Sequence, residues 1–298
     1  MAEFPEIARP LVELQPEHAF FVGIDSDGCV FDTMEIKHKE CFIPNVINHW
    51  GLQSISKYAR EAGEFVNLYS KWRGVNRWPA LIKVFDLLSE RAEVQRRGAA
   101  IPAVPKIREF IASDLPKSND SLSALVDETG DPELTKALAW SLAVNATIAD
   151  MVHGVAPFPY VREILERMTD SADAIVVSQT PVEALVREWQ EHSIDGYVKV
   201  IAGQELGTKT EHLRYAAAGK YEQEKMLMIG DAPGDMRAAK ANGALFYPIN
   251  PGAEEASWER FHGEAYDRFI AGTYGGAYEE ALIAEFETYL PDVPPWKR

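Results

Sequence analysis

The sequence predicts an α/β protein with a Rossmann-like parallel sheet, helices on both faces of that sheet, and an inserted all-helical domain. Short buried apolar runs alternate with helix-period segments in the second half of the chain. A similar run at residues 20–24 is separated from them by about 120 residues that contain no convincing strand pattern. Several of these runs end at an Asp or a Ser, which is typical of a ligand site at the edge of a sheet.

The first strand is expected at residues 20–24, a run of β-branched and aromatic residues of the right length for a buried strand. Asp25 follows it, and Asp27 and Gly28 come next. Two carboxylates at the mouth of a buried strand repel each other, so a cation is expected beside them. Mg²⁺ is the simplest choice because it prefers oxygen ligands. An ordinary acidic turn is the alternative, since Asp-Gly is a common turn signal.

Residues 34–154 are predicted to form the helical domain. Helix-period apolar positions occur in six segments separated by Gly and Pro, at residues 36–50, 56–72, 79–97, 104–113, 121–128 and 132–152. This stretch holds 15 basic and 15 acidic residues, so the whole net charge of −16 falls on the remainder of the chain. A neutral insert within an otherwise acidic chain indicates two domains with different functions.

From residue 157 onward the pattern alternates between helix and strand. Strands are expected at 174–177, 198–202, 225–229 and 244–247, with helices at 159–169, 181–191, 211–218 and 236–242. Such alternation predicts parallel strands, whose carboxyl ends share one edge of the sheet. Asp25, Ser178 and Asp231 should therefore meet there. We assign residues 1–33 and 155–298 to the α/β domain, with 252–298 as a C-terminal helical extension that packs on the sheet or on another subunit.

Composition narrows the function. The acidic net charge argues against binding to nucleic acid or to an anionic membrane. No run approaches the roughly 18 apolar residues of a membrane span, and the first residues lack the features of a signal peptide. The two cysteines, Cys29 and Cys41, favour a reducing cytoplasm over a disulfide scaffold. Cys29 is interpreted as a packing residue more readily than as a nucleophile. The sequence does not indicate an oligomeric state.

Four signals stand in a fixed order along the chain: Asp25-Ser-Asp27-Gly28 with Asp32, Ser178 after its strand, Lys209, and Gly230-Asp231-Ala-Pro-Gly-Asp235. Together they resemble the haloacid dehalogenase-like (HAD) superfamily, most of whose members are phosphatases. The last motif continues into a small-residue helix that ends at Gly243, as in that family. Thr210 stands where the family commonly has a Pro after the Lys.

The resemblance implies a role for each of these residues. Asp25 would attack phosphorus and form an aspartyl-phosphate, and Asp27 would serve as general acid and base. Mg²⁺ would be held by Asp25, Asp231 and the main-chain carbonyl of Asp27. Asp235 would either ligate the ion or act from just outside its ligands. The remaining expected contacts go to the phosphoryl group, from Ser178, the Gln179 amide and Lys209.

The carboxylate at Asp27 favours ester chemistry over dehalogenation within this family. The helical insert lies where the family places its C1-type cap, and it contains Gly74-Val-Asn-Arg77. This segment resembles the Gly-x-x-Arg segment of phosphoglycolate phosphatase and β-phosphoglucomutase-like members, so Arg77, then Arg73, are candidate substrate-binding residues. A Mg²⁺-dependent phosphatase acting on a small phosphorylated metabolite is the leading hypothesis. A sugar phosphomutase is the alternative, although Lys37 stands where mutase-type members carry a His. The third possibility is a binding or regulatory module that has lost its catalytic activity.

Overall fold

The computed structural model describes residues 4–297, which form two compact units. Residues 4–33 and 154–290 make an α/β unit, and residues 34–153 and 291–297 make a helical unit. The chain therefore passes between the units three times, after residues 33, 153 and 290. The predicted boundaries differ from this division mainly at the C-terminus, because the sequence predicts 291–298 as part of the α/β domain and the structure places 291–297 in the helical unit. Residue 298 lies outside the described residues.

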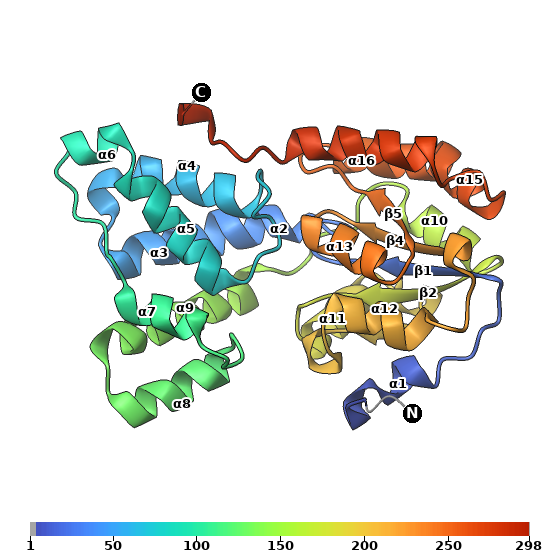
Figure 1. Cartoon of the computed structure of the whole chain (residues 1–298), viewed down its shortest axis with the longest axis horizontal. Coiled ribbons are helices and arrows are strands. Elements are labelled where there is room, and N and C mark those ends of the chain that lie inside the picture. Colours follow the sequence, from blue (N-terminus) through green and yellow to red (C-terminus); the bar gives the residue numbers. More distant parts are fainter. Residues whose placement is uncertain (1–3, 298) are drawn as a thin grey trace. The chain divides into compact units, whose positions relative to one another are not determined.

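The α/β unit contains a five-stranded sheet in the order β3-β2-β1-β4-β5. Its strands are β1 (Phe20–Ile24), β2 (Ala172–Val177), β3 (Val200–Ala202), β4 (Met226–Gly230) and β5 (Leu245–Pro248). Every neighbouring pair is parallel, and β1 lies at the centre (Figure 1). The predicted fold class is confirmed, and all five expected strands are present. β1 is apolar throughout because both of its faces are covered.

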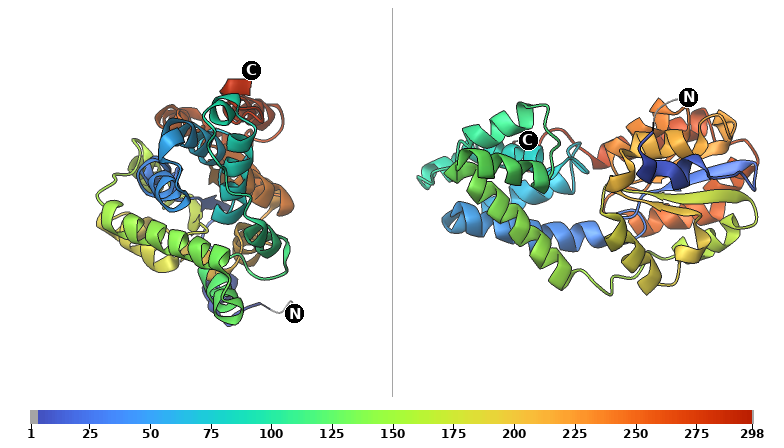
Figure 2. Two further views of the ribbon diagram at one scale, coloured as in Figure 1. Left: turned by 90° about the vertical axis from the view of Figure 1, so that its left-hand side faces the viewer. Right: turned by 90° about the horizontal axis from the view of Figure 1, so that it is seen from below.

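Helices cover both faces of this sheet (Figure 2). Side chains alternate along β1, so that Phe21 belongs to one core and Val22 to the other. The Phe21 face is packed by α12 (Lys209–Ala217) and α13 (Pro233–Ala241). The other face is packed by four helices: α10 (Val161–Met168), α11 (Val182–Glu191), α14 (Glu254–Arg260) and α15 (Tyr266–Ile270). The last long helix, α16 (Ala277–Tyr289), contributes to both cores.

The N-terminal lead-in is anchored to the start of β2. After α1 (Arg9–Val12), the backbone amides of Glu17 and His18 donate to Asp173 Oδ2 at 2.9 and 3.0 Å. The Tyr221 hydroxyl donates to the same oxygen at 2.8 Å. These bonds satisfy a carboxylate that is fully buried, so they fix the chain before it enters β1.

The helical unit consists of helices around an aromatic core. A π-helical segment, Lys37–Phe42, follows α2 (Thr33–Ile36). The remaining helices are α3 (Ile43–Trp50), α4 (Ser56–Asn67), α5 (Arg77–Ser89), α6 (Ala92–Arg96), α7 (Pro105–Ala112), α8 (Asn119–Thr129) and α9 (Pro132–Met151). Trp78 contacts both Phe110 and Trp140 edge to face, which joins α5, α7 and α9. Asp131 caps α9 by accepting hydrogen bonds from the amides of Glu133 and Leu134.

The C-terminal segment, residues 291–297, belongs to the helical unit because its side chains pack there. The Trp296 ring lies edge to face against Phe65, with ring centroids 5.8 Å apart. The guanidinium of Arg91 lies 4.4 Å from the centre of the Trp296 ring and 4.5 Å from that of Tyr58. Lys71 Nζ is 2.9 Å from Asp292 Oδ2. Aromatic, cation–π and ionic contacts thus hold the segment.

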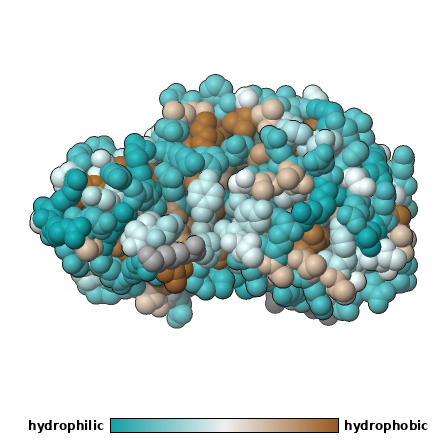
Figure 3. All heavy atoms as spheres, turned by 90° about the horizontal axis from the view of Figure 1, so that it is seen from above, coloured by the Kyte–Doolittle hydropathy of each residue, from teal (hydrophilic) through white to brown (hydrophobic). Residues whose placement is uncertain are grey.

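No helix in residues 4–297 is both long enough and apolar enough to cross a membrane. The face drawn in Figure 3 is mostly hydrophilic, with apolar residues in small scattered groups. Large apolar side chains that are exposed, such as Leu115 and Leu142 in the helical unit, account for some of the apolar surface. Scattered apolar residues of this kind are normal on a protein surface.

Candidate active site

Polar residues that follow three neighbouring strands meet at one edge of the sheet. Asp25 comes directly after β1, Ser178 after β2 and Asp231 after β4. The Asp25 amide continues the pairing with β4 by donating to the Ile229 carbonyl at 3.0 Å, and the Ser178 amide donates to the Ala202 carbonyl at 2.9 Å. Because the strands are parallel and adjacent in the order β2-β1-β4, their carboxyl ends share this edge, as the sequence predicts.

Asp25, Asp231 and Asp235 form a compact group of buried carboxylates. One oxygen from each lies within 4.8 Å of the others, and the three residues are 4%, 2% and 0% exposed. Asp235 comes from the first turn of α13, where its Oδ2 accepts from the Ala232 amide at 3.0 Å. Gly230 permits this close approach, since a Cβ at that position would stand 2.4 Å from the Asp235 Cβ. Three carboxylates at such separations can converge on one cation.

Lys209 places an ammonium group among these carboxylates. Its Nζ lies 2.8 Å from Asp25 Oδ2 and 2.6 Å from Asp235 Oδ1. The residue begins α12, whose start is fixed by a capping box between Thr208 and Glu211. Burial alone would lower the pKa of the ammonium, but the surrounding carboxylates raise it above its ordinary value. Lys209 is therefore charged at neutral pH.

The group carries more negative charge than Lys209 balances. Burial raises the pKa of Asp25 well above its usual value; Lys209 opposes the shift, while Asp235 and Asp231 add to it. Burial also raises the pKa of Asp235, against the effect of Lys209. Three oxygen-donating acids with one ammonium fit a hard divalent cation such as Mg²⁺, which would remove this repulsion.

Asp27 lies on the same loop, and its carboxylate is held by two threonines. Thr33 Oγ1 donates to Asp27 Oδ1 at 2.5 Å, and Thr180 Oγ1 donates to Asp27 Oδ2 at 2.7 Å. The side chain is therefore not one of the three clustered carboxylates. Sequence reasoning missed both threonines as partners of Asp27. Thr180 follows Ser178 by two residues, and a second hydroxyl just past a strand end is the signal that could have identified it.

Ser178 is placed with its hydroxyl at the sheet edge. Its Oγ accepts from the Thr180 amide at 3.2 Å, which leaves the hydroxyl proton available for donation. The Gln179 side chain donates to the Gly207 carbonyl at 2.9 Å, and so links the turn after β2 to the loop that precedes Lys209. The side-chain amide of Gln179 thus has a structural partner within the α/β unit.

Cys29 is fully buried in the loop after Asp27. Burial, then the neighbouring Asp25 and Asp231 carboxylates, raise the pKa of its thiol well above the usual value. A thiol in this setting is not a nucleophile at neutral pH, which agrees with its interpretation as a packing residue.

The two candidate arginines lie in the helical unit. Arg77 Nη1 donates to Ser141 Oγ at 2.7 Å and to Asn145 Oδ1 at 2.8 Å. Its guanidinium lies 5.1 Å from the centre of the Phe42 ring, and burial lowers its pKa to about 10. Arg73 is only 3% exposed, and its Nη1 donates to the Leu68 carbonyl at 2.9 Å.

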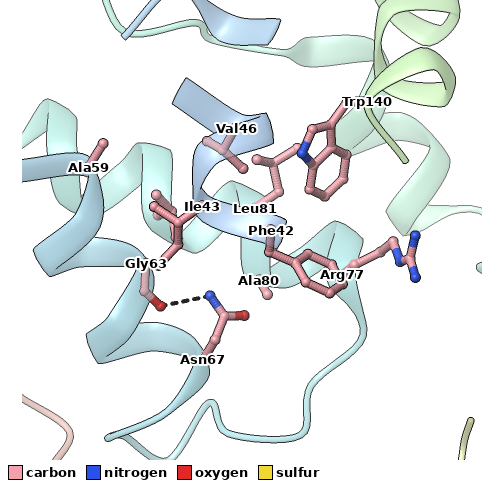
Figure 4. Close-up of a pocket in the computed structure, with 11 residues that line it drawn as sticks. Phe42, Ile43, Val46, Ala59, Gly63, Asn67, Arg77, Ala80, Leu81 and Trp140 are labelled. Atoms are coloured by element: carbon pink, nitrogen blue, oxygen red, sulfur yellow. Dashed lines mark hydrogen bonds between the residues drawn. The ribbon is translucent and has the colours of Figure 1, made fainter. Parts of the chain in front are cut away.

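Arg77 lies beside an apolar hollow in the helical unit (Figure 4). The hollow is small, with a cavity volume of about 20 Å³. Phe42, Leu81 and Trp140 are among its lining residues, and the Asn67 side chain donates to the Gly63 carbonyl at its edge. The open part could hold a water molecule but not a metabolite.

Comparison with solved structures finds loose likenesses to HAD-like proteins. A haloacid dehalogenase-like hydrolase from Streptococcus pneumoniae superposes with a TM-score of 0.43 and 15% identity, covering 82% of this chain and 91% of that one. A haloacid dehalogenase-like hydrolase from Xanthomonas campestris gives a TM-score of 0.45 and 11% identity, covering 88% and 97%. Neither likeness is close enough to inform function. Among curated proteins, none matches the sequence.

A family model matches part of the chain. Residues 106–247 match the model of the haloacid dehalogenase-like hydrolases. The matched stretch includes Ser178, Lys209, Asp231 and Asp235, and the structure brings these residues together with Asp25, which follows β1 and lies outside the match. This stretch of the chain is therefore similar to the haloacid dehalogenase-like hydrolases.

Proposed function

We propose that this protein is a hydrolase, a Mg²⁺-dependent phosphatase that acts on a small phosphorylated metabolite through an aspartyl-phosphate on Asp25. The observation that carries the proposal is the meeting of Asp25, Asp231, Asp235 and Lys209 at the sheet edge, with Asp27 two residues from Asp25. A phosphate monoester is anionic and repels an anionic nucleophile. Catalysis of its hydrolysis therefore depends on positioning and on positive charge.

Asp25 is suited to act as the nucleophile. The Ser26 amide donates to its Oδ1 at 2.8 Å and Lys209 approaches its Oδ2, so the carboxylate is oriented while both oxygens keep lone pairs. Attack by Asp25 on phosphorus would break the bond to the ester oxygen. Water would then attack phosphorus, release inorganic phosphate and restore Asp25.

Asp27 is suited to move the proton in both steps. It would give a proton to the departing ester oxygen and take one from the attacking water, so that it ends as it began. The hydroxyls of Thr33 and Thr180 hold its two oxygens. A hydroxyl can either donate or accept a hydrogen bond, so both threonines can keep contact with Asp27 in its charged and its protonated form.

The remaining groups would bind the phosphoryl oxygens. Ser178 offers a hydroxyl proton and Lys209 an ammonium charge. Mg²⁺, held by Asp25, Asp231, the Asp27 carbonyl and either directly or indirectly by Asp235, would supply the positive charge that brings nucleophile and phosphoryl group together.

The helical unit would act as a cap that reads the rest of the substrate. Arg77 is the best-supported contact. Its guanidinium donates to the neutral oxygens of Ser141 and Asn145 and burial disfavours its charge, so an anionic group on the substrate would stabilise it. Arg73 is the weaker candidate. Its hydrogen bond to the Leu68 carbonyl suits it to shaping the turn that leads to Arg77.

The test measures hydrolysis of para-nitrophenyl phosphate with and without Mg²⁺. We expect metal-dependent release of phosphate that chelation abolishes and Mg²⁺ restores. Asp25→Asn should lower kcat by about a thousandfold or more, because the amide is a poor nucleophile and a poor metal ligand. The matched control is Asp170→Asn, the same change at an exposed residue before β2, at the far ends of the strands; it should leave kcat unchanged.

Full activity of Asp25→Asn in a folded protein would overturn the assignment of the nucleophile. A screen of phosphorylated sugars, phosphoglycolate and nucleotides would then identify the substrate class. Conversion of a sugar phosphate that needs a bisphosphate activator and releases no net phosphate would point to a mutase instead. Absence of both Mg²⁺ binding at millimolar concentration and hydrolysis would favour a lapsed binding module.

A further inference from the structure

Ser26 lies between the proposed nucleophile and the proposed acid–base, and it is fully buried. Its carbonyl accepts from the amides of Val30 at 2.8 Å and Phe31 at 3.2 Å, which curls the loop back on itself. Its hydroxyl is directed to α11 and not to the clustered carboxylates. Oγ accepts from the Trp189 indole Nε1 at 3.0 Å and donates to Glu188 Oε2 at 3.3 Å.

Trp189 is a firm support for this hydroxyl. Its side chain is fully buried and packs edge to face against Phe31, at the far end of the same loop, with ring centroids 6.0 Å apart. The loop from Asp25 to Phe31 is thus held to α11 at two points, one polar and one aromatic. The indole has a single N–H donor, and it is used in the bond to Ser26. This bond fixes the distance between the loop and α11.

We propose that Ser26 is a positioning residue, whose hydroxyl, held by Trp189, sets the placement of Asp25 and Asp27 relative to each other and to the clustered carboxylates. This inference rests on the proposed phosphatase function. The physical reason is that Asp25 and Asp27 flank Ser26 directly, so any shift of Ser26 moves both carboxylates. Moving reacting groups by a fraction of an ångström to one ångström lowers the reaction rate strongly.

Packing alone would not require a hydroxyl at this position. A small apolar residue at position 26 and a Phe at position 189 would pack together equally well, without two buried polar groups that each need the other as a partner. The pair of Ser26 and Trp189 instead gives a directional bond, which restrains the loop in a way that van der Waals contact does not.

The test compares Ser26→Ala, Trp189→Phe and the double variant. Both single changes remove the hydrogen bond between Ser26 and Trp189, and Ser26→Ala also removes the longer bond to Glu188. Each should lower kcat for para-nitrophenyl phosphate about tenfold, and the double variant should lower it no further than Ser26→Ala does. KM should change less than twofold, since neither side chain contacts substrate. Thermal stability should instead fall further in the double variant, because each change also removes packing.

Trp258→Phe is the matched control. Its indole Nε1 donates to the Cys29 carbonyl at 2.7 Å and its side chain is also fully buried, but it supports the loop beyond Asp27. We expect it to lose comparable stability while keeping kcat within twofold. Equal losses of kcat in Trp258→Phe and Trp189→Phe, or kcat values that simply follow stability, would overturn the positioning role.

A second measurement does not depend on turnover. Calorimetric titration with Mg²⁺ should show weaker binding in Ser26→Ala than in the wild type, by about three- to tenfold, because displaced carboxylates hold the ion less well. Unchanged kcat and Mg²⁺ affinity in Ser26→Ala would refute this inference while the phosphatase assignment stands. A wild-type protein without Asp25-dependent hydrolysis would refute the proposed function itself.

Discussion

His212 is a fully buried residue on α12, one turn after Lys209. Burial, then the positive charge of Lys209, lowers the pKa of its imidazole to about 4. In the unfolded chain a His has a pKa of about 6.5. Between these two values the unfolded state binds the proton and the folded state does not. The protein should therefore lose stability as the pH falls from about 6.5 toward 4.

His212→Gln removes this titration while keeping a polar side chain of similar size. Relative to the variant, the wild type should lose about 2 kcal/mol of unfolding free energy between pH 7 and pH 4.5. Urea unfolding at a series of pH values measures this difference. The exposed His153→Gln is the control and should follow the wild type at every pH. Parallel curves for wild type and His212→Gln would contradict the prediction.

Several site residues are predictable one at a time because the signal is local. Asp25, Ser178 and Asp231 each follow an apolar run directly, so the end of a strand identifies them. The partners of Asp27 are different. Thr180 is 153 positions away from Asp27, and nothing in the sequence near either residue indicates that their side chains meet.

The close approach of β4 and α13 depends on a glycine, Gly230, at their junction. In Gly230→Ala the new Cβ would overlap Asp235, with the Cβ and Oδ2 atoms of that residue 2.4 and 2.5 Å away. Asp235 is fully buried and bonded to Lys209, so it has little room to yield. We expect a loss of about 1–3 kcal/mol in unfolding free energy, and weaker Mg²⁺ binding from the displaced carboxylate.

Chemical denaturation and calorimetry with Mg²⁺ measure the two effects. Gly263→Ala is the matched control, because a Cβ there meets no atom within 4 Å and the residue lies in the helical segment Phe261–Ala265. That change should be neutral or should stabilise the protein by up to about 1 kcal/mol. A stable Gly230→Ala protein with normal metal binding would show that α13 can shift without cost.

Strands were located more accurately than helices. Predicted and observed strands agree to within two residues at each end, because buried parallel strands are short apolar runs with clear limits. The predicted helix at 79–97 is instead two helices, α5 and α6, separated around Arg91. Arg91 has extended backbone angles and a buried side chain between Tyr58 and Trp296. The apolar period continues across this break, so the sequence does not reveal it.

At the scale of the whole molecule, the C-terminal segment ties the end of the chain to the helical unit. Trp296→Ala would remove the ring that covers Arg91 and Phe65. We expect a loss of about 2 kcal/mol, from the buried ring area and the cation–π contact. Amide hydrogen exchange should therefore become faster in α4 and α6, and stay unchanged in β1, β2 and β4.

Val293→Ala is the control in the same segment, since Val293 is 47% exposed. It should leave exchange in the helical unit as in the wild type. Uniformly faster exchange in both units after Trp296→Ala would show that the two unfold together, and no change would show that the ring contributes nothing.

The sequence does not indicate that residues 291–297 belong to the helical unit. Trp296 and Arg91 are more than 200 positions apart, and the aromatic residues from 252 onward share one helical spacing although they divide between two units. Local patterns predict elements and the motif residues of the site. They do not predict which distant body a terminal segment joins.

The packing of residues 291–297 in the helical unit has a practical consequence for labelling this protein. A fluorophore attached to the side chain of Lys297 would report on the helical unit, even though the nearest long helix, α16, belongs to the α/β unit.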